Sequence, residues 1–194
     1  MNFIRNFSLF IVLSAPVLTQ GFSEYLTMED IKNNPVYMAT LALRKAAQKG
    51  DVKKMEKCIQ KGADVNDVEG RSWPHAGRTI LTYTIDSGSV EAVELLLKSG
   101  AIVEDIAEVP YFLNTLKPVE RNFSQLSYAL ILHASTEIIE LLIRYSKDIN
   151  SASWYYGWTA YKIAAFYKDY RVMALLEKAG ADTDTSISEL KVLQ

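Results

Sequence analysis

The stretch Lys61-Gly-Ala-Asp-Val-Asn66 decides how this chain folds, because related stretches return along the sequence. They are Ser99-Gly-Ala-Ile-Val-Glu104, the looser Tyr145-Ser-Lys-Asp-Ile-Asn150, and Ala179-Gly-Ala-Asp-Thr-Asp184. Each one follows a short apolar segment with the spacing of an amphipathic helix. These segments cover residues 52–59, 90–97, 138–143 and 172–176. Repetition on this scale predicts a stack of similar units.

The repeated units share a register. A further short helix with small residues near its middle is expected before each apolar segment. Three units run 21 steps from their first residue to the glycine of the repeated stretch: Leu41 to Gly62, Thr79 to Gly100, and Thr159 to Gly180. The third unit begins at Ser124 and is one residue longer. We expect its extra residue in the turn at 133–136.

This helix-turn-helix-loop unit resembles the ankyrin repeat, whose consensus contains T-P-L-H-x-A-A, G-H, V-V-x-L-L-L and G-A-D-V-N. The resemblance implies an all-α repeat solenoid of four ankyrin repeats over 41–184, divided into 41–78, 79–123, 124–158 and 159–184. The consensus proline is replaced by Ile80, Gln125 and Ala160, and the consensus histidine by Thr82, Ser127 and Lys162.

The end units of such a stack need covers. We expect an N-terminal capping segment at 22–40 and a C-terminal cap at 185–194. Pro35, in the first helical position after Asn34, predicts a long capping helix that runs to about Gln48. Ile187, Leu190 and Leu193 are spaced to cover the last unit.

Residues 1–21 have the pattern of a cleavable signal peptide. Arg5 precedes the apolar run 7–18, which is too short for a membrane-spanning helix and is interrupted by Pro16. Cleavage predicts a periplasmic protein with no membrane span. The alternatives are an uncleaved anchor and a buried N-terminal helix. Initiation at Met28 would instead give a cytosolic form that keeps all four units.

Composition points away from several function classes. The net charge is −2 with both signs mixed along the chain, which argues against nucleic-acid binding. The two histidines, His75 and His133, fall in different units, and Cys58 takes a core leucine position of the repeat. Because no catalytic motif, metal-ligand spacing or phosphate loop is found, we expect no catalytic residues, metal or cofactor, and no enzymatic activity.

The loops are where we expect function. The connections 63–78 and 101–123 are longer than the ankyrin family's, and long loops in compact proteins often carry function. The resemblance implies that loops and the exposed side of each first helix bind partners. The predicted partner-binding residues are Arg71, Trp73, His75, Tyr111, Trp154, Tyr155 and Tyr156. Alternatively, the loops bury their own aromatic residues, which is favoured for Phe112. Trp158 is expected at the hairpin base.

Together these features favour a periplasmic protein-binding module that is monomeric until it meets a protein partner. The sharpest hypothesis is an immunity protein that neutralises a toxic effector, such as a type VI secretion phospholipase or amidase. Two alternatives stay open: an envelope scaffold or stress accessory that stabilises a periplasmic enzyme, and an exported effector that binds host proteins.

Overall fold

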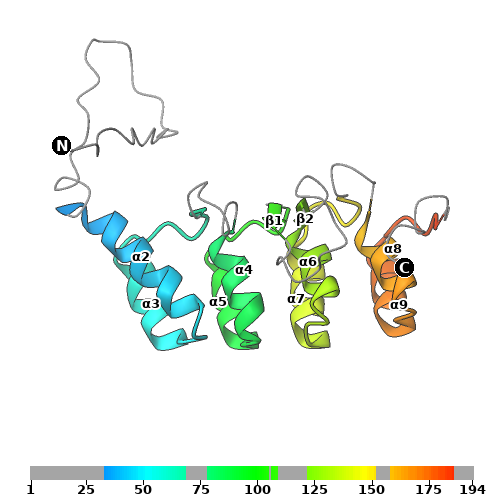
Figure 1. The fold of residues 1–194 in the computed structure, drawn as a ribbon, viewed down its shortest axis with the longest axis horizontal. Helices are drawn as coiled ribbons and strands as arrows, with labels where there is room; N and C mark the ends of the chain where they lie inside the picture. The colour runs from blue at the N-terminus through cyan, green and yellow to red at the C-terminus, as the bar shows by residue number, and fades with distance from the viewer. Residues whose placement is uncertain (1–32, 69–77, 105, 109–121, 152–157, 186–194) are drawn as a thin grey trace, which may run out of the picture.

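The computed structural model describes residues 33–68, 78–104, 106–108, 122–151 and 158–185. These residues form eight α-helices in four pairs that stand side by side in a row (Figure 1). The pairs are α2 (Pro35–Ala47) with α3 (Val52–Gln60), α4 (Ile80–Ser87) with α5 (Val90–Lys98), α6 (Gln125–Ile131) with α7 (Thr136–Tyr145), and α8 (Ala160–Phe166) with α9 (Tyr170–Lys178). We number these pairs as units 1 to 4. The helices of the described part of the chain therefore form an array compatible with an all-α repeat solenoid.

Two short strands accompany the helices. Strand β1 (Ile106–Glu108) pairs antiparallel with β2 (Asn122–Ser124), and β2 leads directly into α6. Figure 1 shows this ladder at the edge of the array where α4 and α6 begin. The strands are three residues each, so they form the base of a connection and not a sheet layer.

Each helix begins at a polar residue that accepts a hydrogen bond from the first turn. Thr79, Ser124 and Thr159 do this for the first helices of units 2 to 4, through the backbone N–H three residues later. Asn34 takes two backbone N–H groups at the start of α2, next to Pro35. A cap of this kind contributes about 1 kcal/mol. The Asn34-Pro35 helix start expected from sequence is confirmed.

The turn within each unit has a common geometry. Its residue with positive φ is Gly50, Gly88, His133 and Lys168 in units 1 to 4. After it, the second helix begins from Asp51, Ser89 and Asp169 in three units, one residue further on. In unit 3 the second helix begins from Ser135, two residues after His133. The expected extra residue therefore lies in the 133–136 turn, as the spacing predicted.

The core runs the length of the row. Small residues such as Ala46, Ala129 and Ala164 are buried where the helices of a unit approach one another. One equivalent position holds Cys58, Leu96, Leu142 and Leu176, all buried. The prediction that Cys58 is a core residue is thus confirmed. Because neighbouring units share this core, each one depends on the next for burial.

Helix α2 is the longest helix in the described part of the chain. Helix α2 has 13 residues, against 7 or 8 in the other first helices. This agrees with the expected capping helix. Its first turn leaves Val36, Tyr37 and Met38 exposed at 46%, 40% and 48%.

Several expectations concern other parts of the chain. The signal peptide at 1–21, the start at Met28, the capping segment before residue 33 and the cover at 186–194 lie outside the described residues. The proposed domain boundaries stay predictions. Among the described helices, none combines the length and the apolar character needed to cross a bilayer.

Candidate functional site

The two long connections leave the array from equivalent places. Val68 pairs antiparallel with Thr79, and Ile106 pairs in the same way with Ser124. Val68 stands six residues after Gly62, and Ile106 six residues after Gly100. Thr79 and Ser124 are the caps of α4 and α6. Both connections are therefore hairpins at their base, in a common register.

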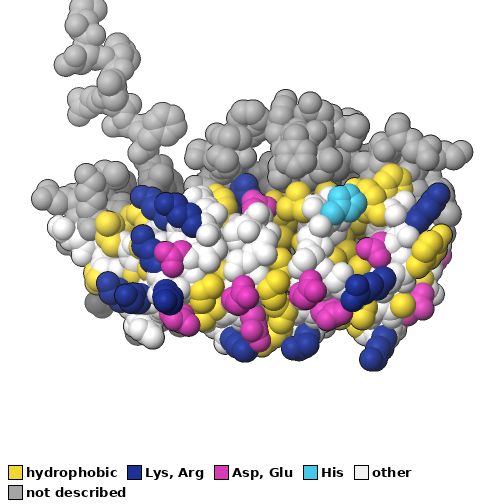
Figure 2. All heavy atoms as spheres, turned by 90° about the horizontal axis from the view of Figure 1, so that it is seen from below, with side chains coloured by type: hydrophobic (Ala, Val, Ile, Leu, Met, Phe, Trp, Pro, Cys, Tyr) yellow, Lys and Arg dark blue, Asp and Glu magenta, His cyan; other side chains and the backbone are white. Residues whose placement is uncertain are grey.

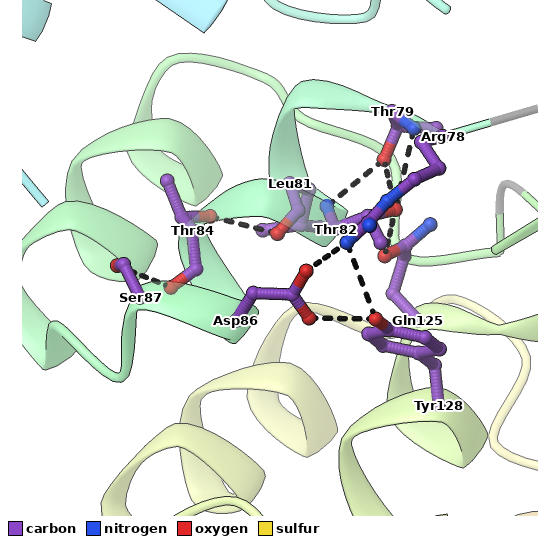
Figure 3. A network of polar contacts seen from close by, with 9 residues as sticks. All are labelled: Arg78, Thr79, Leu81, Thr82, Thr84, Asp86, Ser87, Gln125 and Tyr128. Atoms are coloured by element: carbon purple, nitrogen blue, oxygen red, sulfur yellow. Dashed lines mark hydrogen bonds and ion pairs between the residues drawn. The ribbon is translucent and has the colours of Figure 1, made fainter. Parts of the chain in front are cut away.

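A cluster around Arg78 holds the end of the first connection. Figure 3 shows the Arg78 guanidinium reaching an Asp86 carboxylate oxygen on α4 and the Tyr128 hydroxyl on α6, the latter at 3.4 Å. The Tyr128 hydroxyl donates to the other Asp86 oxygen at 2.6 Å. The guanidinium carbon lies 4.5 Å from the centre of the Tyr83 ring. Residues 78, 83, 86 and 128 form what we call the Arg78 cluster.

The electrostatics of this cluster favour a fixed geometry. Burial raises the pKa of Tyr128, although the nearby Arg78 charge acts in the opposite direction. The phenol therefore stays neutral and keeps the proton that it donates to Asp86. Since Asp86 lies on α4 and Tyr128 on α6, the cluster joins the first connection to units 2 and 3 at once.

A buried polar contact beside the cluster explains some departures from the ankyrin consensus. The Thr82 hydroxyl contacts Thr79 Oγ1 at 3.0 Å and donates to Gln125 Oε1 at 3.1 Å. Thr82 and Gln125 are fully buried. They occupy the consensus histidine and proline positions. The substituted pair thus makes a satisfied hydrogen bond between units 2 and 3 (Figure 3), which a buried polar group requires.

Hydrogen bonds also join the connections of adjacent units. Asn66 accepts from Ile102 N at 3.0 Å and donates to Gly100 O at 3.0 Å. In the next unit, Glu104 accepts from Asp148 N at 3.1 Å. Asn150 accepts from Asp182 N at 2.7 Å. These three bridging residues occupy one position of the repeated stretch, and each binds the backbone of the following unit.

Glu104 accepts more hydrogen bonds from the following unit than the other two bridging residues do. Its carboxylate also accepts from Ser146 Oγ at 3.0 Å and from Lys147 N. Partial burial acts to raise the pKa of Glu104, but the hydrogen bonds from Lys147, Asp148 and Ser146 outweigh it, and the pKa lies below its usual value. The carboxylate is therefore built into the junction of units 2 and 3.

The third connection is anchored by a buried tryptophan. Trp158 is 6% exposed and meets Phe166 edge to face, with ring centres 6.0 Å apart. The expectation that Trp158 packs at the base of this connection is confirmed. Phe166 continues to Tyr167 at 5.2 Å, and Tyr167 to His133 at 4.5 Å.

The predicted partner-binding residues are not among those that the structure describes. Arg71, Trp73, His75, Tyr111, Trp154, Tyr155 and Tyr156 all fall outside the described residues, as does Phe112. The structure describes the base of each connection. From sequence, Arg78 and Glu104 were expected only as residues of the long connections. Their contacts with the neighbouring units were not predicted. The signal for Glu104 was available, because it aligns with Asn66 in the repeated stretch.

The described side chains do not form a recognisable metal-binding or catalytic group. No group of three or more His, Cys, Asp or Glu residues gathers there in a way that could hold a metal ion. His133 lies in the turn of unit 3 and stacks on Tyr167, and Cys58 is buried. A shallow hollow of about 110 Å³ lies between units 3 and 4. Its walls are Leu130, His133, Ala134, Ile139, Ala164, Tyr167 and Asp169.

No family model matches the chain. Part of the chain is similar to the 2-5A-dependent ribonuclease of Mus musculus, with 43% identity over 60 residues. That protein contains ankyrin repeats. The match covers 31% of this chain and 8% of the mouse protein. The similarity is a hint of ankyrin-type repeats within the matched stretch.

Proposed function

We propose that this chain is a protein-binding module of four ankyrin repeats with no catalytic activity of its own. Support comes from the four helix pairs in a common register and from the partial similarity to an ankyrin-repeat protein. The repeat boundaries are those given by the sequence: 41–78, 79–123, 124–158 and 159–184.

The observation that carries this proposal is the way the connections are held. Their bases pair in register, the Arg78 cluster fastens the first, and Asn66, Glu104 and Asn150 fasten each connection to the next unit. A binding surface whose supports are fixed before contact loses less entropy on binding. Loops on such supports suit recognition of a folded partner.

The residues proposed to contact the partner are aromatic or basic. Tyr, Trp and Arg contribute most often to the energetic centres of protein interfaces. We assign the contact to Trp154, Tyr155 and Tyr156 in the third connection, Tyr111 in the second, and Arg71, Trp73 and His75 in the first. The protein partner is expected to bind a monomer.

The cellular role follows from the predicted export. With residues 1–21 removed, the module works in the periplasm of a bacterium. There it acts as an immunity protein that binds and occludes a toxic effector. A phospholipase or an amidase delivered by a type VI secretion system fits this setting. Neutralisation by occlusion needs a rigid binding surface and no chemistry.

The test is protection of cells. A toxin encoded beside this gene is directed to the periplasm with and without this protein, and survival is counted. We expect protection, its loss with Trp154→Ala/Tyr155→Ala, and its retention with the control Tyr170→Ala. The control residue is an exposed tyrosine at the start of α9. Failure to protect against any adjacent toxin contradicts the immunity role, and recovery of a resident envelope enzyme as the partner selects the scaffold role.

A further inference from the structure

Unit 1 differs in charge from the rest of the array. Residues 33–68 hold four acidic residues, Asp51, Glu56, Asp64 and Asp67, and seven basic ones, Arg44, Lys45, Lys49, Lys53, Lys54, Lys57 and Lys61. The other described residues hold eight basic and twelve acidic side chains. Although the net charge of the whole chain is close to zero, unit 1 is therefore basic.

The lysines of unit 1 are exposed and available. Lys53, Lys54 and Lys57 lie on α3, and Lys61 caps it. Their spacing of three and four residues places them along one side of the helix, while Met55 and Cys58 point into the core. We call Lys53, Lys54, Lys57 and Lys61 the lysine face. Within the described ranges, none of the four makes an ion pair, whereas Lys98 on α5 pairs with Glu94 at 2.7 Å.

The net charge of the second helices is positive in α3, negative in α5 and α7, and weakly positive in α9. Exposed Glu91 on α5 and Glu137 on α7 take the position that Lys53 has on α3, whereas Glu94 and Glu140 take the position of Glu56. Figure 2 shows several Lys and Arg side chains at the end of the array formed by unit 1, Asp and Glu side chains over the middle, and further Lys and Arg side chains along the lower edge and at the far end. This segregation gives the array a basic end and an acidic middle.

We propose that the lysine face binds an acidic surface of the protein partner. The proposal rests on the proposed protein-binding function and names the chemistry of the partner. Charge complementarity of this kind raises the rate of association and selects among partners. The lysine face lies on a second helix, so it adds a contact separate from the connections.

Two other anionic partners fit the lysine face less well. A membrane-surface helix combines basic residues with an apolar side that enters the lipid. On the described residues 49–61 the exposed side chains are charged or polar, and the exposed large apolar residues of unit 1 are Val36, Tyr37, Met38 and Val68. Nucleic-acid binding draws on many phosphate contacts, and acidic residues such as Glu56 interrupt the lysine face.

The test uses the protein purified after export, with the N-terminus that the cell leaves on it. The probe is a fluorescent poly-glutamate peptide of about 20 residues at about 50 mM salt, where screening is weak. We expect binding that weakens as salt is raised. The variant Lys53→Gln/Lys54→Gln/Lys57→Gln/Lys61→Gln should bind about tenfold or more weakly, because it removes the four exposed charges that attract the peptide.

A matched variant removes the same charge elsewhere. Lys98→Gln/Arg144→Gln/Lys147→Gln/Lys178→Gln changes four exposed basic residues of units 2 to 4, and it should bind the probe as the parent does. Circular dichroism checks that both variants fold. Equal weakening by the two variants, or no binding of the probe, overturns the proposal. So does stronger lysine-dependent binding to phosphatidylglycerol vesicles or to duplex DNA than to the peptide. Partner binding that depends on Trp154 and Tyr155 but not on the lysine face would leave the proposed function standing.

Discussion

At the scale of single residues, Glu104 stabilises the end of the second helix of unit 3, where the other units have a glycine with positive φ. The second helices of units 1, 2 and 4 are followed by Gly62, Gly100 and Gly180, all with positive φ. In unit 3 the corresponding residue is Ser146, with an extended backbone. The backbone N–H groups after α7 are then bound by Glu104 of the preceding unit. A side chain from unit 2 therefore shapes the end of unit 3.

The pH dependence of stability tests this role of Glu104. The pKa of Glu104 is lower in the folded chain than its usual value of 4.5, so its stabilisation is present above that pH and lost as pH falls through the folded-state pKa. Glu104→Gln should lower the free energy of unfolding by about 1 kcal/mol at neutral pH, because the carboxylate is only partly buried. Urea unfolding at a series of pH values measures it.

The difference between parent and variant should disappear below the folded-state pKa. Glu56→Gln, on the exposed side of α3, is the control and should change stability little at any pH. A Glu104→Gln variant as stable as the parent at neutral pH would show that the carboxylate does not support the junction.

The backbone at Lys168 gives a second prediction at this scale. Lys168 has a φ of 57°, in a turn where units 1 and 2 place Gly50 and Gly88. A side chain in this conformation costs about 1 kcal/mol relative to glycine. Lys168→Gly should therefore raise the melting temperature, and Gly88→Lys should lower it. Calorimetry of the two variants decides, and a melting temperature that falls for Lys168→Gly contradicts the assignment of strain.

At the scale of elements, the Arg78 cluster should behave as a coupled unit. Removing Arg78 leaves Asp86 and Tyr128 without their cation. The losses of unfolding free energy caused by Arg78→Ala and Asp86→Ala should therefore not be additive. A double-mutant cycle in urea should give a coupling of about 1–2 kcal/mol for this partly buried pair. The control cycle uses Lys98 and Glu94, an exposed pair four residues apart on α5, and should give a clearly smaller coupling. Similar couplings for the two pairs would contradict the role given to the cluster.

The elements also show how far the sequence alone reaches. Local spacing predicted the second helices, the long α2 and the extra residue of unit 3, because helix starts and turns depend on neighbouring residues. Trp158 was placed correctly for the same reason. The contact of Asp86 with Tyr128 spans 42 residues, and no local pattern contains it. The aromatic residues of the connections could be named from composition but not placed.

At the scale of the whole molecule, the account depends on export. The protein recovered from the periplasm of a bacterial host should begin at Phe22, having lost residues 1–21. Intact-mass measurement shows this directly, with Met28→Leu as the control for internal initiation. A single species beginning at Phe22 and unchanged in Met28→Leu supports one exported form, whereas a full-length species held in the membrane fraction contradicts the cleaved signal.

Calorimetric titration of the captured partner tests whether the rigidly supported connections hold a protein partner. Trp154→Ala/Tyr155→Ala should weaken binding by at least about 30-fold, since truncating one aromatic anchor costs about 2 kcal/mol or more. Tyr170→Ala, at the exposed start of α9, should leave the dissociation constant within about threefold of the parent, because Tyr170 is not one of the assigned anchors. Equal affinities for the parent and the Trp154/Tyr155 variant would show that the third connection is not the binding surface.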